Sequence, residues 1–150
     1  MKVVIQRVSQ ANVISDGLMV CKINIGLLLL LGIEHDDQEE DADWLGDKII
    51  KMRIFSDADG KMNLSVTDVN GEIMVVSQFT LQASTKKGNR PSFIKAARPD
   101  QANRLYWYFK NRLQSITGKE IASGLFGEDM KVNLINDGPV TIIIDTKNKE

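Results

Sequence analysis

The polar segment "SQFTLQ" (77–82) has the residue types of a site that polarises a carbonyl group. It follows the apolar run "EIMVV", so its polar residues stand at the end of an expected strand. Hydroxyl, amide and backbone N–H groups are the components of an oxyanion-stabilising site. An edge strand with polar outward positions is the competing interpretation. The candidate catalytic residues, acting mainly through their backbone, are Ser77, Gln78, Phe79 and Thr80.

Conventional catalytic groups are scarce elsewhere. His35 is the one histidine and Cys21 the one cysteine, so the chain has no disulfide framework and fits a reducing cytosol. Nothing near Thr80 in the sequence would activate its hydroxyl as a nucleophile. The run from Asp57 to Gly60 resembles a calcium loop, but Met62 stands where the sharp-turn glycine belongs. We expect no metal, no cofactor and no side chain acting as a conventional base.

A basic segment follows the polar strand end. No acidic residue lies between Glu72 and Asp100. This charge pattern suits an anionic partner such as an RNA backbone, whereas a solvated surface loop is the plainer interpretation. The candidate tRNA-binding residues are Lys86, Lys87, Arg90, Lys95 and Arg98.

A Gly-Pro pair interrupts the last apolar stretch. The segment "NDGPVT" (136–141) separates "MKVNLI" from "TIIID", and its first four residues all favour turns. Local sequence therefore predicts two strands joined by a turn. A trans peptide bond is expected at that level, because only about 5–6% of X-Pro bonds are cis.

Length and composition limit the fold. The chain has 150 residues, 43% of them hydrophobic, and a formal net charge of −1, which excludes a disordered protein. We expect one domain over residues 1–150. The start "MKVVIQRV" lacks the layout of a signal peptide, and "INIGLLLLLGI" is too short to span a bilayer. These features predict a cytoplasmic protein without a membrane segment.

Hydrophobic periodicity gives the elements that must position these residues. The first 33 residues predict three or four strands, and residues 34–55 one amphipathic helix. A strand is expected over 72–83 and a second helix from Pro99 to Gly118, whose apolar face carries Ala102, Leu105, Tyr106, Phe109 and Leu113. The prediction is an α+β fold with a mixed, largely antiparallel sheet, a barrel-like core and two main helices.

Several segments together resemble the D-aminoacyl-tRNA deacylases, also called D-Tyr-tRNA deacylases. They are "QRVSQANV", "SQFTL", "KKGNRPSF" and "LFGEDMKVNLINDGPVT", and they span essentially the whole chain in order. The resemblance implies that family's fold and a homodimer that hydrolyses D-aminoacyl-tRNA without a cofactor, a membrane or DNA. It also implies a cis Gly138-Pro139 bond that reaches into the partner subunit's pocket as a chiral gate. Arg7, Asn136 and Thr141 would support this gate.

The resemblance also implies a chemical step assisted by the 2′-hydroxyl of the terminal ribose. Because glycine has no side chain to reject, glycyl-tRNA is expected to be a substrate as well. Two alternatives from other classes stay open at this point. One is a non-catalytic RNA-binding module, and the other is a small oligomeric hydrolase that acts on free metabolites.

Overall fold

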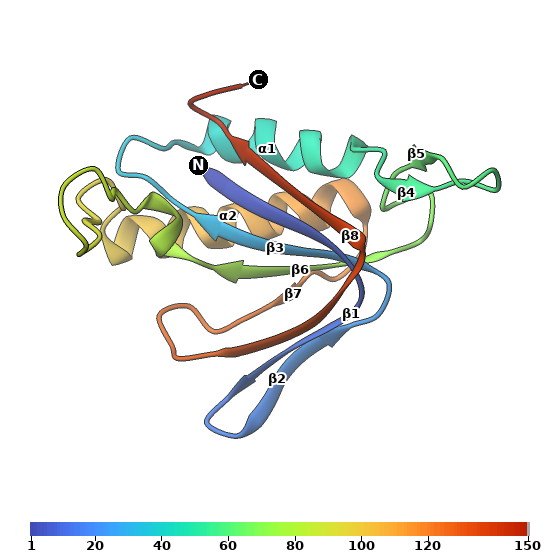
Figure 1. Ribbon diagram of the computed structural model, residues 1–150, viewed down its shortest axis with the longest axis horizontal. Coiled ribbons are helices and arrows are strands. Elements are labelled where there is room, and N and C mark those ends of the chain that lie inside the picture. The colour runs from blue at the N-terminus through green and yellow to red at the C-terminus, as the bar shows by residue number, and fades with distance from the viewer. Residues whose placement is uncertain (150) are drawn as a thin grey trace.

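The computed structural model describes residues 1–149 and shows one curved, mixed sheet packed against two helices (Figure 1). The strands of this sheet are ordered β2-β1-β3-β6-β7, and β8 pairs with the other side of β1. A separate two-stranded sheet contains β4 and β5. The bounds are β1 Lys2–Ser15, β2 Leu18–Ile23, β3 Gly26–Gly32, α1 Glu39–Lys51, β4 Phe55–Ser56, β5 Met62–Leu64, β6 Glu72–Ser77, η1 Phe79–Gln82, α2 Pro99–Thr117, β7 Ala122–Ser123 and β8 Lys131–Asp145.

Strand β1 is the centre of the sheet. Its first half pairs antiparallel with β3, its second half pairs antiparallel with β2, and its opposite edge pairs antiparallel with β8 along nearly its whole length. Strands β3, β6 and β7 run parallel to one another. Because β2 also approaches β7, the sheet nearly closes into a barrel, and the predicted α+β fold class is confirmed.

Two apolar clusters fill the molecule. The larger lies between the sheet and both helices, and the smaller lies on the concave side where β1, β2, β3 and β6 curve round. Helix α2 begins with Pro99 in its first turn and ends at Gly118, whose φ of 65° is the left-handed conformation that favours glycine. Its buried face carries Leu105, Tyr106, Phe109 and Leu113, as predicted. Neither described helix is both long and apolar enough to cross a membrane.

Three predicted boundaries are wrong. Residues 131–145 form one strand rather than two strands joined by a turn, because both halves pair with the same neighbour, β1, in the same direction. The first helix covers Glu39–Lys51 only, since Gln38 and Asp41 form a capping box at its start and the chain is extended at Met52. Strand β6 ends at Ser77, and a short 3-10 turn replaces the expected continuation to residue 83.

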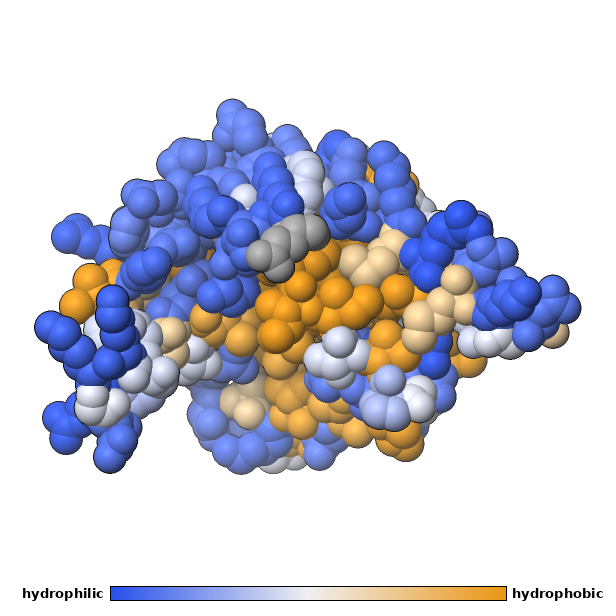
Figure 2. All heavy atoms as spheres, turned by 45° about the horizontal axis from the view of Figure 1, so that its top comes forward, coloured by the Kyte–Doolittle hydropathy of each residue, from blue (hydrophilic) through white to orange (hydrophobic). Residues whose placement is uncertain are grey.

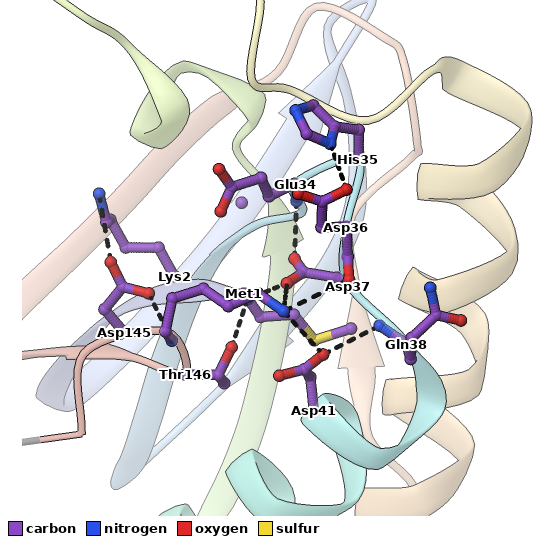
Figure 3. A network of polar contacts seen from close by, with 12 residues as sticks. Met1, Lys2, Glu34, His35, Asp36, Asp37, Gln38, Asp41, Asp145 and Thr146 are labelled. Carbon is purple, nitrogen blue, oxygen red and sulfur yellow. Dashed lines mark hydrogen bonds and ion pairs between the residues drawn. The ribbon is translucent and has the colours of Figure 1, made fainter.

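A buried polar network closes the end of the sheet at which β1 begins (Figure 3). The α-ammonium group of Met1 donates to Asp37 Oδ1 at 2.5 Å and to Thr146 Oγ1 at 2.6 Å. Lys147 also lies 3.4 Å from Asp37 Oδ1 and 3.2 Å from Asp41 Oδ2. The charges compensate one another, so the network fixes β1, β8 and the start of α1 relative to each other.

Candidate active site

The segment 77–82 turns sharply at the carboxyl end of β6. The N–H group of Gln78 donates to the carbonyl oxygen of Leu31 at 2.8 Å and ends the pairing of β6 with β3. The 3-10 turn η1 then crosses directly over Gly32. A Cβ atom at Gly32 would lie 2.9 Å from both the carbonyl oxygen of Gln78 and Cβ of Leu81. A glycine at position 32 therefore permits the close approach that places η1 at the sheet's end.

The turn leaves two backbone donors free. Among the described residues, the N–H groups of Phe79 and Thr80 have no backbone acceptor, as expected for the first donors of a helical turn. Both residues are exposed. The N–H group of Gln78, which the sequence prediction included among the oxyanion donors, is already used by Leu31 and must be removed from that role. The available donors are thus Phe79 and Thr80.

The hydroxyl of Thr80 has a single polar partner in the described chain. It accepts a hydrogen bond from Nε2 of Gln78 at 2.5 Å, so an amide and not a base contacts it. Ser77 is half-buried and lines the neighbouring pocket. No histidine, lysine or carboxylate contacts either hydroxyl among residues 1–149, and the arrangement suits orientation of a substrate better than nucleophilic attack.

A pocket of about 490 Å³ opens beside η1. Its walls are mostly apolar and come from β6, the start of α2 and the segment before β8. Most of these residues carry no local sequence signal of a site, although "LFGEDM" lies inside a segment that carries the family resemblance. The lining residues other than those at 77–79 are Ile33, Val76, Ala97, Pro99, Ala102, Phe126, Gly127, Glu128, Met130 and Val132.

The Gly-Pro pair lies inside β8, where the strand breaks register with β1. The peptide bond between Gly138 and Pro139 is cis, and both residues are exposed. Gly138 has a φ of 133°, and a Cβ atom there would lie 2.8 Å from Nη2 of Arg7. Conformation and contact both require glycine at this position.

Side chains hold this loop from two sides. Buried Arg7 donates from Nε to the carbonyl oxygen of Asp137 at 2.9 Å and from Nη1 to the carbonyl oxygen of Ile54 at 2.6 Å. Asn136 accepts from the N–H group of Val140 at 2.8 Å and donates to Oγ1 of Thr141 at 2.9 Å. Charge-assisted bonds of the Arg7 kind are among the stronger protein hydrogen bonds. The residues expected to support the gate therefore all contact the loop.

In Figure 1 the carboxyl end of β6, which carries the pocket, lies at one end of the sheet, and β8 bends near the other end. Ser77 lies opposite Leu31, which lies opposite Val3, whereas the gate lies beside Arg7, four residues further along β1. The path from Ser77 to the gate crosses three interstrand spacings, from β6 through β3 and β1 to β8, and runs four residues along β1. Together these two displacements amount to a distance of roughly 20 Å. Gly138 and Pro139 therefore do not contact the Gln78 site of their own chain.

The basic side chains predicted to bind RNA lie on the segment between η1 and α2. Lys86, Lys87, Arg90 and Arg98 are exposed, and within residues 1–149 they form no ion pair. Lys95 lies 3.8 Å from Glu34, and its side chain is 69% exposed. The first four charges are therefore available to an external anion.

The remaining chemical candidates stay outside the site. Cys21 lies in β2, where burial raises the pKa of its thiol against the opposing effect of Lys110, which makes the thiolate scarcer. His35 is a loop residue 2.8 Å from Asp36. No group of three or more histidine, cysteine or acidic residues in the described part of the chain is arranged to hold a metal ion.

Solved structures show the class of fold to which this chain belongs. A structure described as "c-Myc DNA Unwinding Element Binding Protein" matches with a TM-score of 0.91 and 40% identity, covering 97% of this chain and 98% of that one. A structure described as a probable eukaryotic D-amino acid tRNA deacylase matches with a TM-score of 0.83 and 16% identity, covering 95% and 97%. The second likeness shows the fold alone, and that fold is the α+β fold of the tRNA deacylases.

Sequence comparison then gives the family. The family model described as D-Tyr-tRNA(Tyr) deacylase matches residues 4–145. Proteins named D-aminoacyl-tRNA deacylase from Flavobacterium psychrophilum and Flavobacterium johnsoniae are 64% and 61% identical over 150 residues, with both chains fully covered. One from Akkermansia muciniphila is 59% identical over the same length. The chain belongs to the D-Tyr-tRNA(Tyr) deacylase family, and the membership predicted from its motifs is confirmed.

Proposed function

We propose that the protein hydrolyses the ester between a D-amino acid and the terminal adenosine of tRNA, and that Gly138 and Pro139 of a second copy exclude L-aminoacyl-tRNA. The family match supports the hydrolase activity. The observation that carries the proposed chemistry is the pair of free N–H groups, on Phe79 and Thr80, at the rim of an apolar pocket. Donors of this kind stabilise the oxyanion that forms when an ester is attacked.

The pocket beside η1 receives the terminal adenosine in this proposal. Its volume of about 490 Å³ and its apolar walls suit a flat base. Phe79 belongs both to the pocket lining and to the turn that carries the donors. A base held in the pocket therefore places the 3′ ester next to the free N–H groups.

The substrate supplies the group that the chain lacks. The 2′-hydroxyl of the terminal ribose lies beside the 3′ ester and can orient or activate the attacking water. Thr80 has only the amide of Gln78 as a described polar partner, which supports a role in positioning rather than in attack. A well-placed proton-transfer group is worth about 10²–10⁴ in rate.

The gate acts through its backbone. Recognition by side-chain fit fails for many different D-amino acids, since one methylene changes binding by only about 1–3 kcal/mol. A rigid loop close to the substrate's Cα instead leaves no room where an L side chain projects, whatever that side chain is. Glycyl-tRNA has no such side chain and is hydrolysed in this proposal. Full resistance of glycyl-tRNA under conditions that cleave D-tyrosyl-tRNA would contradict the steric mechanism.

A second copy is required because gate and pocket lie roughly 20 Å apart in one chain. The surface on the outer side of β1 and β8 supports such a copy. Figure 2 shows an apolar band across this face. In β8 itself, Ile143 and Ile135 are 67% and 51% exposed. The outer edge of β8 pairs with no described strand. Exposed apolar surface of this kind marks an interaction site.

The dimer has its own test. Ile143→Asp places a charge in the apolar band and is expected to shift the protein to a monomer in light scattering, with loss of deacylation. Leu18→Asp is the matched control, because Leu18 is 72% exposed on the β1-β2 hairpin away from the band. A monomeric wild-type protein that discriminates D from L substrates would contradict the shared site.

The four unpaired cations and Lys95 contact the tRNA in this proposal, so binding weakens as salt rises. We also propose a cytoplasmic location, because charged tRNA is used there.

The decisive assay compares D-tyrosyl-tRNA and L-tyrosyl-tRNA with catalytic amounts of purified protein. We expect many turnovers of the D ester and none of the L ester, and we expect Pro139→Ala to cleave both. Stoichiometric binding without turnover would favour the RNA-binding alternative. Equal cleavage of free D-tyrosyl esters, insensitive to salt, would favour a metabolite hydrolase.

A further inference from the structure

The segment that follows the basic loop is held firmly. Ser84 and Ser92 exchange two backbone hydrogen bonds, of 2.8 and 2.9 Å, which close the loop at its base. A few residues later the N–H group of Ala97 donates to the carbonyl oxygen of Ile33 at 3.0 Å. Phe93 lies between these two anchors, so its position relative to the sheet is fixed.

Phe93 extends the wall of the pocket outward. Its ring packs edge-on against Phe79 with ring centroids 5.1 Å apart and planes at 68°. Phe79 lines the pocket and is 55% exposed, whereas Phe93 is half-buried and lies outside the lining. The two rings thus make an aromatic surface that begins at the pocket and leads away from it.

Cations follow this aromatic surface. Lys86 and Arg90 lie on the loop closed by Ser84 and Ser92, and neither forms an ion pair with any described residue. In Figure 1 the loop projects from the same end of the molecule at which β6 ends. Fixed aromatic rings beside unpaired cations are the combination that binds single-stranded nucleic acid, through base stacking and phosphate contacts.

We propose that Phe93 is the stacking surface for the nucleotide that precedes the terminal adenosine, with the loop cations on its phosphate. This inference rests on the proposed function, in which the terminal adenosine fills the pocket. The strand leaving the pocket then passes Phe79 and reaches Phe93 and the loop. Phe93 positions the substrate without touching the ester, and it makes the enzyme prefer a polynucleotide to a lone aminoacyl-adenosine.

Phe93→Leu tests this role, because leucine retains apolar packing against Phe79 but has no flat ring. Two substrates are compared: D-tyrosyl-tRNA, and D-tyrosyl-adenosine, which lacks the preceding nucleotide. We expect KM for D-tyrosyl-tRNA to rise about five- to hundredfold, the range for one lost stack, with kcat unchanged. Both constants for D-tyrosyl-adenosine stay unchanged, and Phe93→Tyr behaves like the wild type.

The matched control is Ile94→Ala, since Ile94 is the adjacent apolar residue and is 86% exposed. It leaves both substrates unaffected. An equal KM rise on both substrates would overturn the inference, because Phe93 would then act only by supporting Phe79. An unchanged KM for D-tyrosyl-tRNA would overturn it too. If instead the wild type fails to cleave D-tyrosyl-tRNA at all, the proposed function itself fails.

Discussion

The carboxyl end of β6 and the loop inside β8 are built in opposite ways. At the end of β6, the N–H groups of Phe79 and Thr80 have no backbone acceptor among the described residues. Inside β8, Arg7 donates to the carbonyl oxygen of Asp137, and Asn136 accepts from the N–H group of Val140. Free donors can bind a charge that develops during a reaction, whereas a loop held by bonds on both sides of Gly138 and Pro139 can act as a fixed barrier.

This difference assigns the chemical step to the end of β6 and the selection between D and L substrates to the loop inside β8. In the proposed function, the pocket end supplies the oxyanion donors for ester hydrolysis, and the gate end supplies the rigid backbone for steric rejection. Since the sheet holds them roughly 20 Å apart in one chain, the proposed function requires that they combine between two copies. A change at one end is therefore expected to leave the role of the other end intact.

The largest effect is expected from the substrate. A terminal 2′-deoxyadenosine removes the only group assigned to proton transfer, so D-tyrosyl-tRNA cleavage falls by about 10²–10⁴ in single-turnover rate. Thr80→Ala keeps the backbone donor and loses less than about tenfold. The opposite order of the two effects would restore threonine as the nucleophile.

The backbone donor is tested by a matched pair at one residue. Phe79→Pro and Phe79→Ala both lose the ring, but only proline lacks the N–H group, and the first position of a helical turn tolerates it. We expect kcat of the proline variant to lie about 10²–10³ below that of the alanine variant. Equal rates, with equal melting temperatures, would remove Phe79 from the oxyanion site.

The selectivity of the gate is expected to depend on Arg7, which holds the loop in place. Arg7→Ala removes the bonds to Asp137 and Ile54, so the loop gains freedom while the pocket stays intact. The ratio of kcat/KM for D-tyrosyl-tRNA over L-tyrosyl-tRNA is expected to fall at least about tenfold, equivalent to about 1.4 kcal/mol. Arg104→Ala is the control, because Arg104 pairs with Glu39 on the helices. An unchanged ratio in the Arg7 variant would exclude Arg7 from the gate.

The smallest effect concerns stability at the network of Figure 3. Burial would raise the pKa of Asp41, but hydrogen bonds from Gln38, Thr146 and Lys147 outweigh it and hold the pKa below its usual 3.8. Asp41 therefore contributes its full stabilisation above pH 3.8, and this contribution is lost as the pH falls below 3.8 and through the lower pKa of the folded state.

Asp41→Asn is expected to lower the free energy of unfolding by up to about 1 kcal/mol at pH 7, with the difference shrinking toward pH 3. Urea unfolding at both pH values measures it. The D/L ratio stays at the wild-type value, since Asp41 lies away from both the pocket and the gate. If the difference in the free energy of unfolding between the wild type and Asp41→Asn grew on acidification, ionised Asp41 would not be the stabilising form.

The sequence predicts best where local signals agree with the tertiary structure. Pro99 and Gly118 bound α2 as expected, and the polar end of β6 carries the pocket's rim. Local sequence predicts a turn at residues 136–139 because all four are turn formers. Pairing of β8 with β1, which is distant in the sequence, keeps this segment within one strand instead. Pairing with Leu31 likewise removes the Gln78 donor, and no local pattern contains that information. Phe126 and Met130 reach the pocket only through the fold.

A mixed dimer tests the shared site most directly. One subunit carries Phe79→Pro, the other carries Pro139→Ala, and different affinity tags isolate the heterodimer. The Pro139→Ala subunit keeps a working pocket, and the Phe79→Pro subunit keeps an intact gate. If the gate acts across the interface, this working pocket faces that intact gate. A site shared across the interface predicts cleavage of D-tyrosyl-tRNA at about half the wild-type rate with full protection of L-tyrosyl-tRNA. Cleavage of L-tyrosyl-tRNA by this heterodimer, as by the Pro139→Ala homodimer, would show that each gate serves its own chain and would contradict the account.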